Sequence, residues 1–61
     1  MRIFTKKFFR LSRLDQTAVV NAAIRDLTDQ HYVNAEDERK AREEVQRIAK
    51  KAHHLGIPVQ C

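Results

Sequence analysis

The 61-residue sequence has little of what loops, disulfides and cofactor sites require. Glycine, proline, cysteine and methionine occur once each, and tryptophan is absent. One glycine excludes a glycine-rich phosphate loop, and neither a GxGxxG nor a Walker pattern is present. One cysteine, Cys61, excludes an internal disulfide and favours a reducing compartment. We therefore expect a cytoplasmic protein.

Metal ligands and long apolar runs are also scarce. Besides Met1, the soft-metal ligands are His31, His53, His54 and Cys61, and no C-x-x-C or H-x₃-H spacing joins them. No run approaches the roughly 18 apolar residues of a membrane span, or the apolar centre of a secretory signal. We expect no metal, no cofactor, no export by the secretory route and no membrane partner.

The best-marked element is a helix predicted over about residues 35–55. Asn34 is a good N-cap, and Asp37 stands where a capping box has its second acceptor. Acids crowd the first turn and bases the last, which opposes the helix dipole at both ends. Three acid-before-base pairs have i,i+4 spacing and are expected to stabilise the helix: Glu36/Lys40, Glu38/Arg42 and Glu43/Arg47.

The end of this helix is marked equally well. Gly56 can adopt the left-handed conformation that follows many helices, and Ile57 can then fold back on Ala52. Pro58 cannot continue the helix. Residues 56–61 are therefore predicted to be a C-terminal tail.

A second helix is predicted over about residues 15–30, with Asp15 as its N-cap and Leu14 and Val19 as a hydrophobic staple. The short connection to the next helix is typical of an antiparallel helical hairpin. Each helix carries a narrow apolar stripe, and we expect the two stripes to form a close-packed seam. The candidate seam residues are Val19, Ala23, Ile24 and Leu27 on the first helix and Ala41, Val45, Ile48, Ala52 and Leu55 on the second.

The first 14 residues form a basic arm that contains five bases and no acid. As a helix, this arm places Ile3, Phe4, Phe8, Leu11 and Leu14 on one face and leaves Phe9 on the polar side. As a strand it alternates poorly, although its aromatic and β-branched residues favour an extended segment. An amphipathic helix and an extended arm both stay open.

Three roles are open for the arm. Its bases are candidates for binding nucleic acid or another anion, with a phenylalanine stacking on a base. A basic amphipathic helix also suits an anionic membrane surface. The third role is structural, with the apolar residues completing the core. The candidate anion-binding residues are Arg2, Lys6, Lys7, Arg10 and Arg13.

The chain is expected to form one domain and to self-associate. A protein of this size buries only about 60% of its unfolded surface, and its core rarely supplies more than about 3–5 kcal/mol. Without a disulfide or a metal, association is the remaining way to add buried surface. We expect an all-α fold: the hairpin at residues 15–55 with the arm folded over it, paired as a dimeric helical bundle.

The order of elements, a short N-terminal segment followed by two helices with VNAE at the start of the second, loosely resembles the ribbon-helix-helix repressors. The resemblance implies a dimer whose paired N-terminal strands enter the major groove of DNA, with outward-facing arm residues contacting the bases. Three features depart from that family: the poor alternation of the arm, the glycine-free turn, and a second helix that is long and highly charged.

For function, the sequence favours a non-enzymatic regulatory protein that self-associates and binds an unidentified protein partner. The carboxylates alternate with bases along a helix, which is typical of a solvated face and not of an active site. Motif-free chains of this size are common among phage and plasmid accessory proteins, so such a role is expected. The alternative is a DNA- or RNA-binding regulator that uses the basic arm, either ribbon-helix-helix-like or helical.

Overall fold

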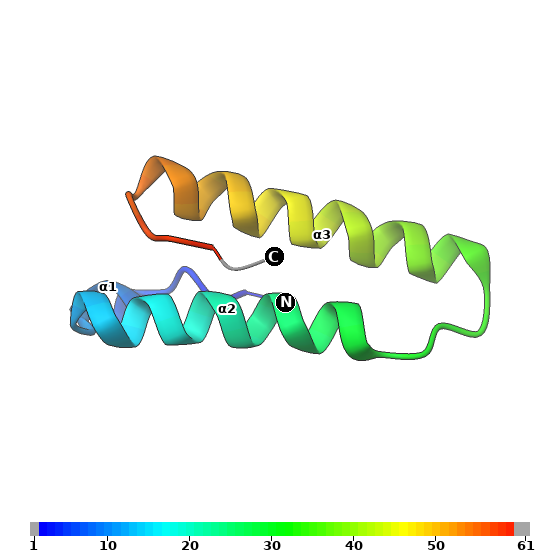
Figure 1. Cartoon of the computed structure of the whole chain (residues 1–61), viewed down its shortest axis with the longest axis horizontal. Helices are drawn as coiled ribbons and strands as arrows, with labels where there is room; N and C mark the ends of the chain where they lie inside the picture. The colour runs from blue at the N-terminus through cyan, green and yellow to red at the C-terminus, as the bar shows by residue number, and fades with distance from the viewer. Residues whose placement is uncertain (1, 60–61) are drawn as a thin grey trace.

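A computed structural model describes residues 2–59 as three helices. They are α1 (Lys6–Arg10), α2 (Arg13–Asp29) and α3 (Ala35–His54). The helices α2 and α3 pack against each other in an antiparallel hairpin (Figure 1). No strand occurs in the part of the chain that the structure describes. The predicted all-α hairpin is therefore confirmed, with a short N-terminal helix added to it.

The hairpin has a closed end, where residues 30–34 connect α2 to α3, and an open end, where α2 begins and α3 ends. The segment before α1 and the segment after α3 both run back from the open end along the hairpin (Figure 1). The result is an elongated molecule of 37 × 18 × 15 Å. Cys61 lies outside the described residues, so the prediction about it stays a prediction.

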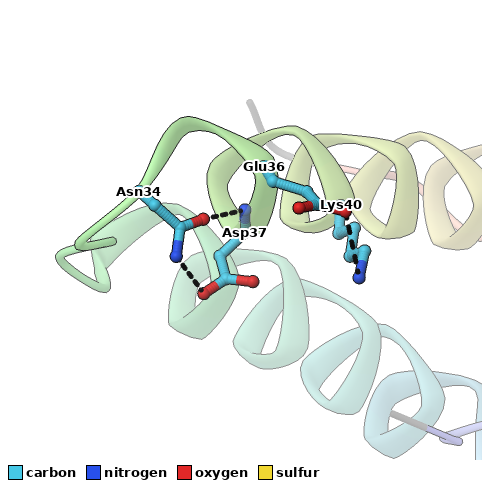
Figure 2. A network of polar contacts seen from close by, with 4 residues as sticks. All are labelled: Asn34, Glu36, Asp37 and Lys40. Carbon is cyan, nitrogen blue, oxygen red and sulfur yellow. Dashed lines mark hydrogen bonds and ion pairs between the residues drawn. The ribbon is translucent and has the colours of Figure 1, made fainter.

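The start of α3 follows the sequence prediction. The Oδ1 atom of Asn34 accepts a hydrogen bond from the backbone N–H of Asp37 at 2.8 Å, which makes Asn34 the N-cap (Figure 2). The side-chain amide of Asn34 also donates to Oδ2 of Asp37 at 3.2 Å. The carboxylate of Asp37 thus faces the side chain of Asn34, whereas a capping box directs it to the backbone N–H.

Two of the three predicted ion pairs on α3 are confirmed. Lys40 lies 3.7 Å from Glu36, and Arg42 lies 2.8 Å from Glu38. The third prediction is wrong in its partner, because Arg47 pairs with Glu44 at 2.8 Å and not with Glu43. Residues three and four positions before a base are both within its reach, so spacing alone does not choose between them.

The end of α3 also follows the prediction. The N–H of Ile57 donates to the carbonyl of Ala52 at 2.9 Å, and the N–H of Gly56 donates to the carbonyl of His53 at 3.0 Å. These two bonds make the Schellman motif, which requires the left-handed φ of +74° that Gly56 adopts. The motif turns Ile57 back into the core, where only 3% of its surface is exposed.

The predicted start of α2 is wrong. The N-cap is Ser12, whose Oγ accepts a hydrogen bond from the backbone N–H of Asp15 at 3.2 Å. Asp15 therefore lies in the first turn, where its charge suits the helix dipole. Leu14 is inside the helix and 79% exposed, so it makes no hydrophobic staple. Ser12 and Asp15 are both good capping residues, and their spacing allowed either one.

The N-terminal arm is neither one long helix nor a strand. Only Lys6–Arg10 are helical, with Thr5 as the N-cap. Phe8 is buried and meets Phe4 edge to face, with 5.1 Å between ring centroids. The predicted single apolar face over residues 3–14 is therefore wrong at its far end, because the chain turns after α1.

The hydrophobic core lies between α2 and α3 at the open half of the hairpin. The N-terminal segment contributes Phe8 to it, and the C-terminal tail contributes Ile57. Two of the core residues on α2 and α3, Ala23 and Ala52, are alanines, which bury little area each. The buried core cluster consists of Phe8, Val20, Ala23, Ile24, Ile48, Ala52 and Ile57.

Candidate interaction site

The candidate anion-binding residues differ in the contacts that their side chains make. Arg2, Lys6, Lys7 and Arg10 are exposed, and none of them takes part in the ion pairs found among residues 2–59. Arg13 differs, because its Nη1 donates to the carbonyl of Leu55 at 2.6 Å. It ties the first residue of α2 to the end of α3. The α1 bases are thus the freest candidates for an external partner.

Apolar side chains lie exposed beside these bases. Phe9 is 51% exposed, although its ring meets the buried Phe8 edge to face at 5.2 Å. Leu11 and Leu14, which follow α1, are also exposed. An aromatic ring between unpaired bases can contact an apolar surface or stack on a base. We call Lys6, Lys7, Phe9 and Arg10 the basic corner.

The candidate seam residues all lie on the inner faces of the hairpin. Five of them are buried and the others are half-buried. The buried ones are Ala23, Ile24, Ala41, Ile48 and Ala52, and the half-buried ones are Val19, Leu27, Val45 and Leu55. The sequence set lacked Phe8, Val20 and Ile57, which also belong to the core. Helical periodicity also places Val20 on the apolar stripe of its helix, and Ile57 and Phe8 were expected at the core only if the tail and the arm folded back, as they do.

The two sides of the hairpin differ in what covers them. On one side, Ile3 and Phe4 lie against α3 and line a hollow of about 280 Å³ with Glu44 and Ile48. We call this the arm side, and α1 packs at its open end through Phe8. On the other, the tail side, the amide of Asn21 donates to the carbonyl of Pro58 at 3.1 Å.

Neither covering segment reaches the closed end, and each side has a groove there. The arm-side groove has a volume of about 470 Å³, and Glu44 lines both it and the hollow beneath the arm, so the two adjoin. Its lining residues are Leu27, Gln30, Tyr32, Asp37, Lys40, Ala41 and Glu44.

The tail-side groove has a volume of about 320 Å³. It shares Leu27, Tyr32 and Ala41 with the arm-side groove. The hydroxyl of Tyr32 donates a hydrogen bond of 2.6 Å to the carbonyl of Leu27, and Tyr32 lines both grooves. The arm-side groove is shallow and open to solvent, and charged side chains of α3 line both grooves.

Charge is distributed unevenly along the molecule. The basic corner lies at the open end, where Lys50 and Lys51 of α3 add further positive charge. At the closed end, the last turn of α2 and the first turn of α3 carry acids and no base, and two of these acids, Glu36 and Glu38, pair with Lys40 and Arg42 of the next turn of α3. These acids are Asp26, Asp29, Glu36, Asp37 and Glu38. Two copies lying antiparallel would bring unlike charges together.

Metal-ligand side chains are not gathered into a cluster in the part of the chain that the structure describes. Residues 2–59 contain no group of three or more His, Cys, Asp or Glu side chains that could hold a metal ion. His53 and His54 lie side by side at the end of α3, with ring centroids 6.3 Å apart, and both are exposed. None of the three described helices has the length and apolar character needed to cross a bilayer.

Comparison with known proteins adds no family to this description. No protein-family model matches the chain, and neither a curated protein nor a solved structure is a match for it.

Proposed function

We propose that this chain is a small, non-enzymatic, helical interaction protein that self-associates and, as a dimer, binds another macromolecule. The observation that carries the proposal is the amount of apolar surface left uncovered. Phe9 and Leu14 are largely exposed, and the grooves at the closed end lie over Leu27 and Ala41. Large uncovered apolar surfaces on a small protein are typical of interaction sites.

The small core supports self-association in particular. Two of its seven buried members are alanines, and a core of this size rarely supplies more than about 3–5 kcal/mol. The paired charges on α3 support the non-enzymatic part of the proposal, because these carboxylates already stabilise the helix. A single cysteine suits the reducing cytoplasm. The accessory role in a phage or plasmid remains a prediction from size.

Sedimentation velocity over a hundredfold range of micromolar concentrations tests the self-association. We expect a species of twice the 7.2 kDa monomer mass that dissociates on dilution. A 7.2 kDa species at every concentration would overturn the proposal. A macromolecule that binds the dimer, but does not bind a variant that cannot dimerise, would be identified as the further partner.

The second candidate function is nucleic-acid binding by the basic corner. The observation that favours it is the absence of a described ion pair on Lys6, Lys7 or Arg10, next to the exposed ring of Phe9. Since residues 2–59 contain no strand, the candidate takes a helical form and not that of a paired ribbon.

Salt separates the two functions. Binding to a mixed-sequence DNA duplex should weaken log-linearly with salt, with a slope of about 0.9 for each phosphate contact. Replacement of Lys6, Lys7 and Arg10 by glutamine should abolish that binding and leave the helical circular dichroism spectrum in place, because all three are exposed. If the wild-type protein shows no salt-dependent binding to duplex or single-stranded DNA or RNA, the second function is excluded.

A further inference from the structure

The N-terminal segment covers only half of the arm side. Residues 3 and 4 and the helix α1 lie over the open half, where Phe8 enters the core. Over the closed half, the described arm residues do not extend, and the arm-side groove of about 470 Å³ lies there beside the half-buried Leu27 and Tyr32 and the buried Ala41. One side of the hairpin therefore has a helix on one half and a groove on the other.

The exposed area of the chain is larger than that of a compact monomer. The chain exposes 5019 Å², whereas a compact folded protein of 7.2 kDa exposes roughly 4,100 Å². The difference reflects the elongated shape of the hairpin. An interface of standard size buries roughly 800 Å² of each partner, so the chain has enough exposed surface to pack against a second copy of itself.

The charges on the two halves of the arm side are opposite. Lys6, Lys7 and Arg10 of α1 carry positive charge with no acid among them. The groove is lined by Asp37 and Glu44, with Lys40 as its one base. Since Glu44 pairs with Arg47 and Lys40 with Glu36, Asp37 is the lining acid that makes no ion pair among residues 2–59. Opposite charges across an interface guide the partners and fix their relative orientation.

Helical periodicity adds a further acid to this rim. Asp26 lies on the same side of α2 as Val19 and Gln30, which contact the core and the groove respectively. Asp29, at the end of α2, falls on the face of the helix turned away from α3. Asp26 of α2 and Asp37 of α3 are therefore the acids that border the arm-side groove from its two helices.

We infer that two copies of the chain pair antiparallel across their arm sides, so that the basic corner of each docks in the arm-side groove of the other. This inference rests on the proposed self-association and adds its surface and orientation. A two-fold axis makes both contacts identical and closes the assembly as a dimer. The exposed ring of Phe9 then covers Leu27, Tyr32 and Ala41, and the bases of α1 face Asp26 and Asp37.

Other arrangements fit less well. A parallel pair would place the three α1 bases of one copy against those of the other, and like charges in an interface are destabilising. The tail-side groove lies on the opposite side of the hairpin from α1, so the same two-fold axis cannot join it to the basic corner.

A charge-exchange experiment tests the orientation. The corner variant carries Lys6→Glu and Arg10→Glu, and the groove variant carries Asp26→Lys and Gln30→Lys, of which Gln30 lines the groove. All four residues are exposed. The new lysines lie in the last turn of α2 and at its C-cap, where a base suits the helix dipole, so the fold is not weakened there. The matched control is Arg39→Glu with Lys50→Glu, which changes the net charge as much as the corner variant does, on exposed positions of α3 that face away from α2.

Each variant alone faces like charges at both contacts and should dimerise at least roughly 100-fold more weakly than the wild type in sedimentation velocity. An equimolar mixture faces opposite charges at both contacts and should form a heterodimer about as readily as the wild type dimerises. The control should dimerise normally. A variant that unfolds alone and refolds in the mixture, followed by circular dichroism, supports the same interface.

Three outcomes would overturn the inference: a corner or groove variant that dimerises like the wild type, a mixture that stays monomeric, or a control that loses the dimer as the variants do. A corner variant that dimerises normally but loses binding to a DNA duplex would assign the basic corner to nucleic acid instead. A wild-type protein that is monomeric at every concentration overturns the proposed self-association itself, and that result needs neither variant.

Discussion

Ile48 lies in the middle of the seam on α3, and 2% of its surface is exposed. Ile48→Asp should abolish the fold, because an unpaired buried charge costs about 3–5 kcal/mol, as much as a core of this size supplies. Circular dichroism should show no cooperative melting. Glu43→Gln is the control, because Glu43 is exposed and makes no ion pair among residues 2–59, so its loss should cost less than about 0.5 kcal/mol. A cooperative transition in Ile48→Asp would contradict the assignment of this residue to the core.

Arg13 has a structural contact that distinguishes it from the other bases of the arm. Its side chain donates to the carbonyl of Leu55 at 2.6 Å and approaches Gly56. Arg13→Gln should therefore destabilise the protein by about 1 kcal/mol, the usual loss for one hydrogen bond. Thermal melting measures this change, and Arg39→Gln, which removes an exposed base of α3 that faces away from α2, should leave the melting temperature unchanged. Equal melting of the two variants would show that the bond to Leu55 adds no stability.

The sequence predicted the buried residues of the seam more accurately than the exposed residues of the arm. Helical spacing selected Ala23, Ile24, Ile48 and Ala52 for the seam, and all four are buried. It also grouped Leu14 with the apolar face of the arm, and Leu14 is 79% exposed. The reason is that spacing assigns faces only within one helix, whereas the chain breaks between α1 and α2.

At the scale of the helices, α3 depends on its N-cap. The side chain of Asn34 satisfies the N–H of Asp37 and holds its carboxylate (Figure 2). Asn34→Ala should cost about 1 kcal/mol, and Asn34→Ser should recover most of it, because serine caps nearly as well. Urea denaturation followed by circular dichroism measures both. If Asn34→Ser is as unstable as Asn34→Ala, Asn34 does not stabilise the protein by capping α3.

The limits of the helices were predictable where local signals are single and unambiguous. The helix α3 has one good cap at Asn34 and one glycine, Gly56, so its ends were predicted closely. The helix α2 has two capping residues, Ser12 and Asp15, and the sequence offered no means to choose the first. The helix α1 is too short for periodicity, and its place is set by the contact of Phe8 with the core.

At the scale of the whole molecule, the grooves were not predictable from the sequence. They exist because the arm and the tail both stop short of the closed end, and no local pattern specifies where a segment lies against another. The uneven distribution of acids and bases along the chain was visible in the sequence, but their positions in space were not. Only the antiparallel hairpin brings Asp26 and Asp37 to one end, away from the bases of α1.

The stability of the whole molecule should depend on its concentration. If association supplies part of the buried surface, dilution shifts the equilibrium toward unfolded monomers by mass action. A hundredfold dilution should lower the melting temperature by several degrees, since about 1 kcal/mol shifts the midpoint of a domain this small by about 4–8 °C. The corner variant, Lys6→Glu with Arg10→Glu, should melt at a lower temperature that is independent of concentration. A wild-type melting temperature that does not change with dilution would mean that the hairpin and its small core are sufficient alone, and that the exposed Phe9 and the arm-side groove serve a different partner.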